Sequence, residues 1–180
     1  MSQQTPPAFE VPAAFASQGL SLRTATDADL ASQRILFETA RPDAAWLSAW
    51  PEAMRVPFLD QQFHFQTVHY SRAYPDADRL IVCARDESIG RLIVDRAKDG
   101  WCIVDIALLP AWRGRGIGAR LLRMVQAAAA ASGVRTMHLT VDADNAAQRL
   151  YVRLGFVVTD HAPPNIAMAW RPPRDQLKTA

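Results

Sequence analysis

Apolar residues recur along this chain in short runs that predict strands. Residues 20–24 alternate apolar and polar side chains, which is typical of a strand with one buried face. Further apolar runs bounded by turn residues lie at 79–84, 89–94, 101–109, 136–141, 156–159 and 166–170. Because the turns at 86–88 and 98–100 are short, we expect the runs that they connect to be antiparallel neighbours.

Four longer segments carry helical patterns. The last two of them should end at Gly133 and Gly155, since glycine commonly follows the end of a helix. The second should be interrupted at Pro51 and Pro57, which leaves 58–73 as its most regular part. Helices are therefore predicted over 26–39, 45–74, 117–132 and 146–154.

The element order is β-α-α-β-β-β-α-β-α-β-β, which predicts an α/β fold of the α+β kind around one mixed sheet. Its antiparallel first half should meet a parallel crossover after the fourth strand. Residues 1–19 and 172–180 are rich in proline and polar residues, so we expect a loose N-terminal segment and a C-terminal tail. This leaves a single domain over 20–171, in keeping with a length of 180 residues.

Composition excludes several classes of protein. The hydrophobic fraction of 49% and the net charge of +2 are ordinary for a globular protein. No apolar run approaches the ~18 residues of a membrane span, and no secretory leader is recognisable, so we expect a cytoplasmic protein without membrane contact. Cys83 and Cys102 lie in apolar runs without CxxC spacing, and the histidines lack metal-ligand spacing, so no metal is expected.

The segment between the fourth strand and the third helix is rich in glycine. It reads Arg-Gly-Arg-Gly-Ile-Gly-Ala, and three glycines in five positions leave backbone N–H groups uncovered beside the positive end of a helix dipole. Such a loop is suited to a pyrophosphate. The candidate ligand-binding residues are Arg113, Gly114, Arg115, Gly116, Ile117, Gly118 and Ala119. No aromatic stacking platform accompanies the arginines, so we expect no nucleic-acid partner.

Taken alone, this loop has more than one interpretation. Gly114, Gly116 and Ala119 also satisfy the dinucleotide fingerprint G-x-G-x-x-G/A, with Asp142 about 20 residues further on. Against that interpretation, residues 110–113 separate the loop from its strand, and hairpin-linked strands precede it. The loop by itself leaves a nucleotide, another phosphate ligand and a structural turn open.

A second motif follows about thirty residues later. Residues 144–156 place Asn145 at a helix start, Tyr151 six residues on, and a Gly-Phe exit into a strand. Together with Arg113-x-x-Gly116-x-Gly118, and with the strand order, this resembles the GCN5-related N-acetyltransferase (GNAT) superfamily over residues 20–170. The resemblance implies the GNAT fold, with the central sheet splayed between strands 4 and 5, and acetyl-CoA as co-substrate.

The resemblance also implies roles for individual residues. A bulge in the fourth strand would let Ile106, Ala107 and Leu108 present backbone groups to the pantetheine arm and the thioester oxygen. Tyr151 would be the general acid, against the alternative of a half-buried tyrosine that packs on the sheet. Asn145 reads as a helix N-cap, a pantetheine partner, or both.

The general base is the point where the sequence departs from the family pattern. The strand-four glutamate of histone-acetylating members corresponds to about Cys102, which is a poor base. Asp105 is the nearest carboxylate, and an acid inside an apolar strand is unusual, so we expect it to act as base or amine anchor, directly or through water. A buried hydrogen-bonding role is the alternative. Covalent catalysis by Cys102 lacks a histidine partner in the sequence.

The second predicted helix carries the candidate acceptor residues. Gln62, Gln66, His69 and Tyr70 share one helical face, and in the family this helix lines the acceptor pocket. The alternative is a helix that packs its aromatic residues on the sheet or on a second subunit, and a homodimer is compatible with the resemblance.

These features predict an acetyl-CoA-dependent N-acetyltransferase that acts on a primary amine of a small molecule, peptide or protein, by direct transfer in a ternary complex. A second hypothesis is a non-catalytic acyl-CoA-binding sensor with the same fold. A third is a dinucleotide-binding oxidoreductase module.

Overall fold

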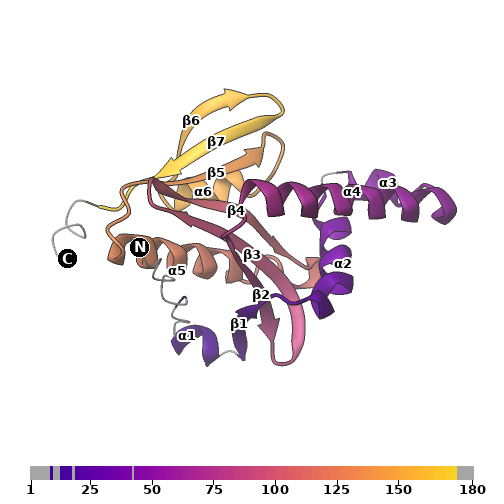
Figure 1. The fold of residues 1–180 in the computed structure, drawn as a ribbon, viewed down its shortest axis with the longest axis horizontal. Coiled ribbons are helices and arrows are strands. Elements are labelled where there is room, and N and C mark those ends of the chain that lie inside the picture. The colour runs from indigo at the N-terminus through magenta and orange to yellow at the C-terminus, as the bar shows by residue number, and fades with distance from the viewer. Residues whose placement is uncertain (1–8, 10–12, 18, 42, 174–180) are drawn as a thin grey trace.

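The computed structural model describes residues 9, 13–17, 19–41 and 43–173. Their centre is a seven-stranded sheet with the order β1-β2-β3-β4-β5-β7-β6 (Figure 1). The strands are β1 (Leu20–Thr24), β2 (Asp78–Ala84), β3 (Glu87–Ala97), β4 (Gly100–Leu108), β5 (Met137–Asp142), β6 (Val157–Ala162) and β7 (Asn165–Trp170). Neighbours from β1 to β4 are antiparallel, and β4 and β5 are parallel. The predicted mixed sheet is confirmed.

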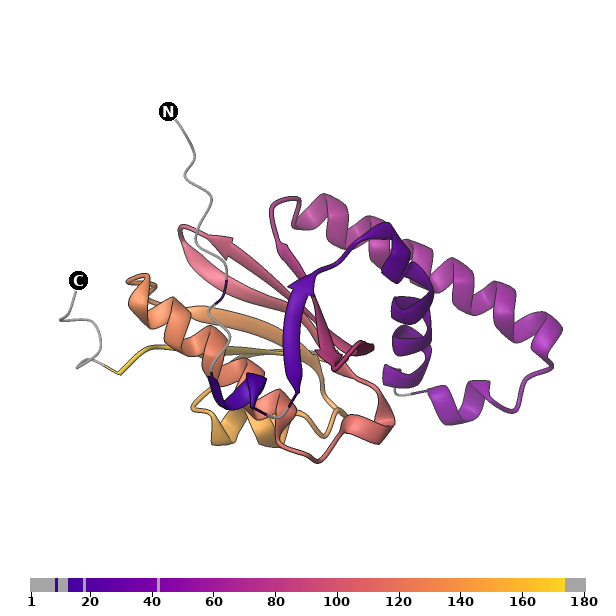
Figure 2. The same ribbon diagram turned by 90° about the horizontal axis from the view of Figure 1, so that it is seen from below.

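Helices cover both faces of this sheet. On one face lie α2 and α4, and on the other lies α5, with α1 near its end (Figures 1 and 2). None of the described helices is long and apolar enough to cross a membrane. The helices are α1 (Ala13–Ala16), α2 (Leu30–Ala40), α3 (Ala44–Leu47), α4 (Glu52–Ala73), α5 (Ile117–Ala131) and α6 (Gln148–Arg153), with short 3₁₀ turns at η1 (Asp27–Asp29) and η2 (Pro110–Trp112).

One predicted break is wrong. Pro51 does precede the start of α4, but the helix continues through Pro57 without interruption. Pro57 removes one hydrogen bond, the one to the carbonyl of Ala53. Both residues are exposed, so water can hydrate that carbonyl and the helix tolerates the proline.

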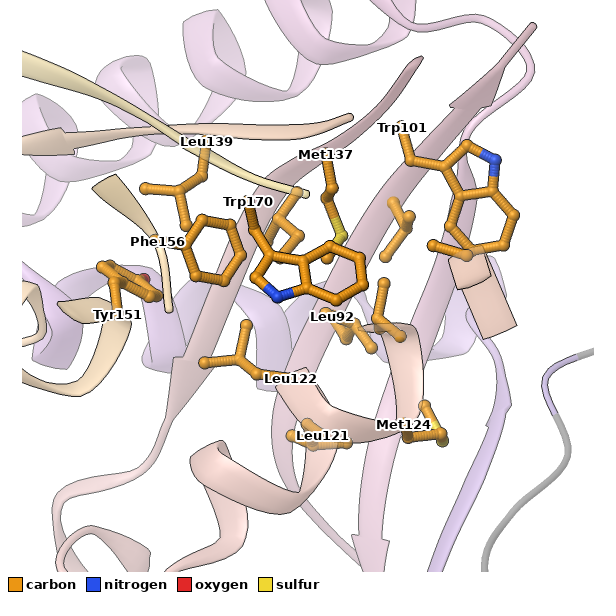
Figure 3. Packing of buried hydrophobic residues seen from close by; sticks show 14 of the residues in the cluster. Leu92, Trp101, Leu121, Leu122, Met124, Met137, Leu139, Tyr151, Phe156 and Trp170 are labelled. Atoms are coloured by element: carbon orange, nitrogen blue, oxygen red, sulfur yellow. The ribbon is translucent and has the colours of Figure 1, made fainter. Parts of the chain in front are cut away.

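The main core lies between the sheet and α5. The buried face of α5 carries Leu121, Leu122, Val125 and Ala129, which recur at helical spacing, and fully burying one such leucine contributes about 2 kcal/mol. Figure 3 shows Phe156 and Trp170 packed above this helix, with Tyr151 beside Phe156. The core therefore fixes α6, which carries Tyr151, against both the sheet and α5.

The N-terminal segment is not loose throughout. Phe15 in α1 is 2% exposed and belongs to the main core, so the expected loose segment through residue 19 does not hold for α1. A hydrogen bond from the backbone N–H of Gly19 to Ala16 leads the chain into β1. Of the predicted loose ends, residues 1–8, 10–12, 18 and 174–180 lie outside the described residues.

A smaller core supports the part of α4 that projects beyond the sheet (Figure 2). Phe37 of α2, Leu47 of α3 and Leu59 of α4 are buried together, and Trp50 and Phe58 pack against them. This cluster anchors the first half of α4, and the second half, which carries Gln66, reaches Arg91 of β3.

Candidate active site

The site begins with an irregularity in β4. Ile93 of β3 pairs with Asp105, whereas Val94 pairs with Ile103, so Val104 is an extra residue and forms a bulge. On the other side, β5 pairs with β4 only from Trp101 to Ile103. The second half of β4 consequently has an open edge toward β5, which confirms the predicted splay.

Backbone groups of β4 point into this gap. The N–H of Leu109 donates to the carbonyl of Ile89 at 2.9 Å, so this residue faces β3. Because successive residues of a strand turn their backbone groups to opposite sides, the N–H groups of Ile106 and Leu108 face the gap. Among the described residues, the open edge thus offers two strand donors, two residues apart.

The glycine loop presents a second row of donors. Gly114 and Gly116 have φ values of 73° and 76°, in the left-handed region that favours glycine. No N–H group from Gly114 to Ala119 donates to a backbone carbonyl of the described residues, and the first such bond inside α5 runs from Arg120 to Gly116 at 3.2 Å. Free N–H groups and the positive end of the α5 dipole make this turn, called the anion loop below, suited to bind an anion.

The open edge and the glycine loop line one cleft of about 670 Å³. All of the cofactor-binding residues predicted from the sequence line it except Arg115, whose guanidinium lies 4.9 Å from the centroid of the Trp112 ring. Sequence reasoning missed Arg153 and Leu150, although both belong to the motif that pointed to Tyr151. The cleft is lined by Ala40, Ile106, Ala107, Leu108, Arg113, Gly114, Gly116, Ile117, Gly118, Ala119, Leu122, Asn145, Ala146, Ala147, Leu150, Tyr151 and Arg153.

Two predicted ligand residues already have partners within the protein. Arg113 donates from Nε to the Leu108 carbonyl and from Nη2 to the Thr39 carbonyl, each at 2.8 Å, so it ties the loop to the end of α2. The side chain of Asn145 accepts a hydrogen bond from the backbone N–H of Ala147 at 2.9 Å, two residues further on. The N-cap of α6 is Ala147, so the predicted N-cap role of Asn145 is wrong: the helix begins later than expected, at Gln148.

Tyr151 lies at the inner end of the cleft. Its side chain packs edge-on against Phe156, with 5.9 Å between ring centroids, and its hydroxyl makes no hydrogen bond within the described residues. Burial, and then the negative charge of Asp105, raise the pKa of Tyr151 to about 12. The phenol is therefore protonated at neutral pH.

A network on the opposite side of β4 contains Asp105. The carboxylate of Asp105 accepts a hydrogen bond from Nε of Arg91 on β3, and Arg91 is only 5% exposed. Nη2 of Arg91 donates to Oε1 of Gln66 on α4 at 2.7 Å. Sequence reasoning missed Arg91, although an arginine inside the apolar run 89–94 is as unusual as Asp105 inside its own strand.

The four candidate acceptor residues divide into two pairs. Gln66 and Tyr70 line a second, smaller pocket next to Arg91, whereas Gln62 and His69 line neither pocket. Burial, and then the charge of Asp105, raise the pKa of Tyr70 to about 12. The structure thus gathers Gln66 and Tyr70 with Asp105 and leaves the other two apart.

Comparison with protein families decides how this arrangement is classified. Residues 76–158 match the sequence model of the acetyltransferase (GNAT) domain. The chain therefore contains a GNAT acetyltransferase domain over these residues. It is accordingly an acetyltransferase, with acetyl-CoA as its acyl donor, as the two motifs predicted. No curated protein matches the sequence.

Solved structures show the same GNAT fold. The PaiA N-acetyltransferase of Thermoplasma acidophilum, in complex with coenzyme A, is 16% identical over 85% of this chain and 99% of its own, with a TM-score of 0.65. A ribosomal-protein-alanine N-acetyltransferase from Escherichia coli is 20% identical over 84% and 93%, with a TM-score of 0.59. YncA of Salmonella typhimurium, with acetyl-CoA, is 17% identical over 87% and 95%, with a TM-score of 0.54.

Two alternatives lose support in this GNAT domain. The sheet of the described residues has one parallel pair of strands, whereas a dinucleotide-binding sheet is built from repeated parallel crossovers. Burial raises the pKa of Cys102, which lowers its thiolate fraction at neutral pH and disfavours covalent catalysis by this thiol. Among the described residues, no group of three or more histidine, cysteine or acidic side chains is arranged to hold a metal ion.

Proposed function

We propose that the enzyme moves an acetyl group from acetyl-CoA to a primary amine of a small molecule or peptide, by direct transfer in a ternary complex. The observation that carries this proposal is the single cleft that unites the free loop N–H groups, the open edge of β4 and the Tyr151 hydroxyl. The loop would bind the pyrophosphate of acetyl-CoA, and the pantetheine arm would extend along β4 toward Tyr151.

In the reaction, the amine nitrogen attacks the thioester carbonyl carbon, the C–N bond forms, and the C–S bond then breaks. Negative charge develops on the carbonyl oxygen before the thiolate leaves. The N–H group of Ile106 or Leu108, which faces the gap, would donate a hydrogen bond to that oxygen, and donors of this kind are worth about 3 kcal/mol in other enzymes.

Tyr151 would act on the departing sulfur. A phenol with a pKa of about 12 is a weaker acid than a thiol with a pKa near 8.5, so complete proton transfer from Tyr151 alone is uphill by roughly 5 kcal/mol. A hydrogen bond from the phenol to the thiolate is the favourable contribution. Full protonation of the sulfur then requires that Tyr151 regain a proton, which the attacking amine releases as it becomes an amide.

Asp105 would receive or anchor the amine on the other side of β4. Arg91 donates a hydrogen bond to one carboxylate oxygen of Asp105, which leaves the second oxygen for the acceptor or for a water molecule. This arrangement favours an anchor that orients a neutral amine, with water carrying the proton away, over direct proton abstraction.

The test is release of free coenzyme A from acetyl-CoA in the presence of a panel of primary amines. Direct transfer predicts initial-rate lines that intersect when both substrates are varied, and a covalent acetyl-enzyme predicts parallel lines. Saturable binding of acetyl-CoA without release of free coenzyme A, with every amine in the panel, would point to the sensor hypothesis instead. Acetylated product identified by mass spectrometry completes the assignment.

A further inference from the structure

A second pocket, of about 190 Å³, lies between η1, α2, α4 and β3. Its volume is that of roughly six water molecules at ~30 Å³ each, enough for a small polar group. Arg91 and Ile93 of β3 contribute to it from the sheet, Gln66 and Tyr70 from α4, and Asp27 from η1. None of these residues lines the cleft described above.

The inner wall of this pocket carries hydrogen-bond donors. Arg91 is 95% buried, since 5% of it is exposed, and it uses Nε for Asp105 and Nη2 for Gln66. Nη1 makes no hydrogen bond within the described residues. The amide nitrogen of Gln66 and the hydroxyl of Tyr70 are likewise without partners there, and burial keeps the phenol protonated. Gln66 and Tyr70 are half-buried, and all three residues line the pocket, so their donors are open to an acceptor that a ligand would supply.

The register of the sheet sets the distance between this pocket and the reacting groups. Arg91 pairs with Ala107, which lines the cleft, and Ile93 pairs with Asp105. Neighbouring strands are about 4.8 Å apart, so a group in the pocket lies only a few bonds from an amine held at Asp105. Asp27, the carboxylate in the pocket lining, is exposed and belongs to the outer rim, whereas the guanidinium of Arg91 is deep.

We propose that this pocket binds a carboxylate of the acceptor, so that the substrate class is a primary amine with a carboxylate a few bonds away, such as an amino acid. The carboxylate accepts hydrogen bonds from Nη1 of Arg91, from Gln66 and from Tyr70, while Asp105 holds the amine. This inference deepens the proposed amine acetylation and rests on it for the position of the amine.

The experiment compares acceptors that differ only in the carboxylate: β-alanine with β-alaninamide, and glycine with glycinamide. Isothermal titration calorimetry on protein saturated with coenzyme A measures binding without turnover, and coenzyme A release measures kcat/KM. We expect each acid to bind at least roughly tenfold more tightly than its amide, as charge-assisted hydrogen bonds require. Gln66→Glu keeps the oxygen that accepts from Arg91 but adds a negative charge, so it should remove the preference. Gln61→Glu, exposed on the same helix and outside both pockets, should retain it.

The outcomes separate this inference from the proposed function. Equal affinity for acid and amide, or a preference that survives Gln66→Glu, overturns the carboxylate pocket even if other amines are acetylated. Acids that bind tightly without any release of coenzyme A leave the pocket in place and overturn the proposed transfer to this class of amine.

Discussion

Arg91 on β3 and Asp105 on β4 form an ion pair in which the cation is the more deeply buried member. The side chain of Arg91 is 6% exposed and that of Asp105 is 20% exposed. The bulge at Val104 lies next to Asp105 and the open edge of β4 begins beyond it, so the pair stands where the sheet opens. The proposed donor face and the proposed acceptor face of the site meet at this pair.

Because the two side chains are buried to different extents, replacing each of them should lower the free energy of unfolding by a different amount. Asp105→Leu leaves a buried guanidinium without its counter-charge, and we expect a loss of about 3 kcal/mol in the free energy of unfolding. Arg91→Leu leaves a carboxylate that water can reach, so its cost should be smaller. Urea unfolding of both variants measures the difference. Equal losses, or a larger loss for Arg91→Leu, would contradict this account of the pair.

The buried tyrosines predict a loss of stability at high pH. The pKa of Tyr151 in the folded protein is about 12, above the ordinary value of 10. A group whose folded pKa is raised contributes stability fully below its unfolded pKa, and this contribution is lost as pH rises through the folded value. The window therefore runs from about pH 10 to pH 12, and a shift of two units corresponds to about 3 kcal/mol.

Tyr151→Phe separates this contribution from other groups that titrate in the same window. The free energy of unfolding of the variant should fall less between pH 9 and pH 12 than that of the wild type, by up to about 3 kcal/mol. Tyr70, whose pKa is also raised to about 12, should give a similar difference in Tyr70→Phe. At neutral pH, Tyr151→Phe should reduce kcat with little change in melting temperature. Parallel pH profiles for variant and wild type would show that the hydroxyl is not buried as described.

Much of the fold could be predicted because local patterns and tertiary packing agree. The apolar runs and their short turns determined the strands, and the switch from hairpins to a crossover located the parallel pair β4–β5. The wrong predictions concern positions where solvent exposure or tertiary packing decides the local structure. Pro57 is tolerated because the helix around it is solvated, and Phe15 is buried by contacts with residues far away in the sequence.

The site was predictable where backbone conformation matters and less so where side chains meet across strands. Glycines mark the anion loop directly, because Gly114 and Gly116 need positive φ. Arg91 was missed because its partner lies 14 residues away in the sequence and is brought to it by the β3–β4 register. The orientation of α4 on the sheet likewise decides which of its polar residues line the smaller pocket. Gln66 and Tyr70 line it, whereas Gln62 and His69 do not.

The glycine loop predicts a separation of stability from affinity. Gly116 and Gly133 have φ values of 76° and 71°, and neither has an atom closer than 3.9 Å to an added Cβ. Gly116→Ala and Gly133→Ala should therefore lose similar stability, about 1 kcal/mol. Gly116 lines the cleft, so Gly116→Ala alone should weaken acetyl-CoA binding, by roughly tenfold or 1.4 kcal/mol. Titration with acetyl-CoA and urea unfolding of both variants test this prediction. Equal dissociation constants for Gly116→Ala and Gly133→Ala would show that the loop does not bind acetyl-CoA.

The cleft residue Gly118 gives a complementary test without backbone strain. Its φ is not in the left-handed region, and an added Cβ would lie 3.5 Å from Cδ2 of Leu150, an ordinary contact. Gly118→Val should therefore fold with a modest loss of stability and still raise the dissociation constant for acetyl-CoA, because the side chain narrows the cleft. An unchanged dissociation constant in this variant would show that the loop does not bind the acyl donor, acetyl-CoA.

Gln126 provides the last prediction, because it joins the two helices that carry the site. It lies on α5, is 9% exposed, and donates from Nε2 to the carbonyl of Leu154 at the end of α6, at 2.8 Å. Gln126→Leu leaves that carbonyl without its donor, and we expect a loss of about 1–2 kcal/mol in the free energy of unfolding. Since α6 carries Tyr151 and α5 begins at the anion loop, the variant should lose kcat while the KM for acetyl-CoA changes little. The exposed neighbour Ala127→Leu is the control, and an unchanged kcat in a destabilised Gln126→Leu would mean that this hydrogen bond holds the fold without positioning Tyr151.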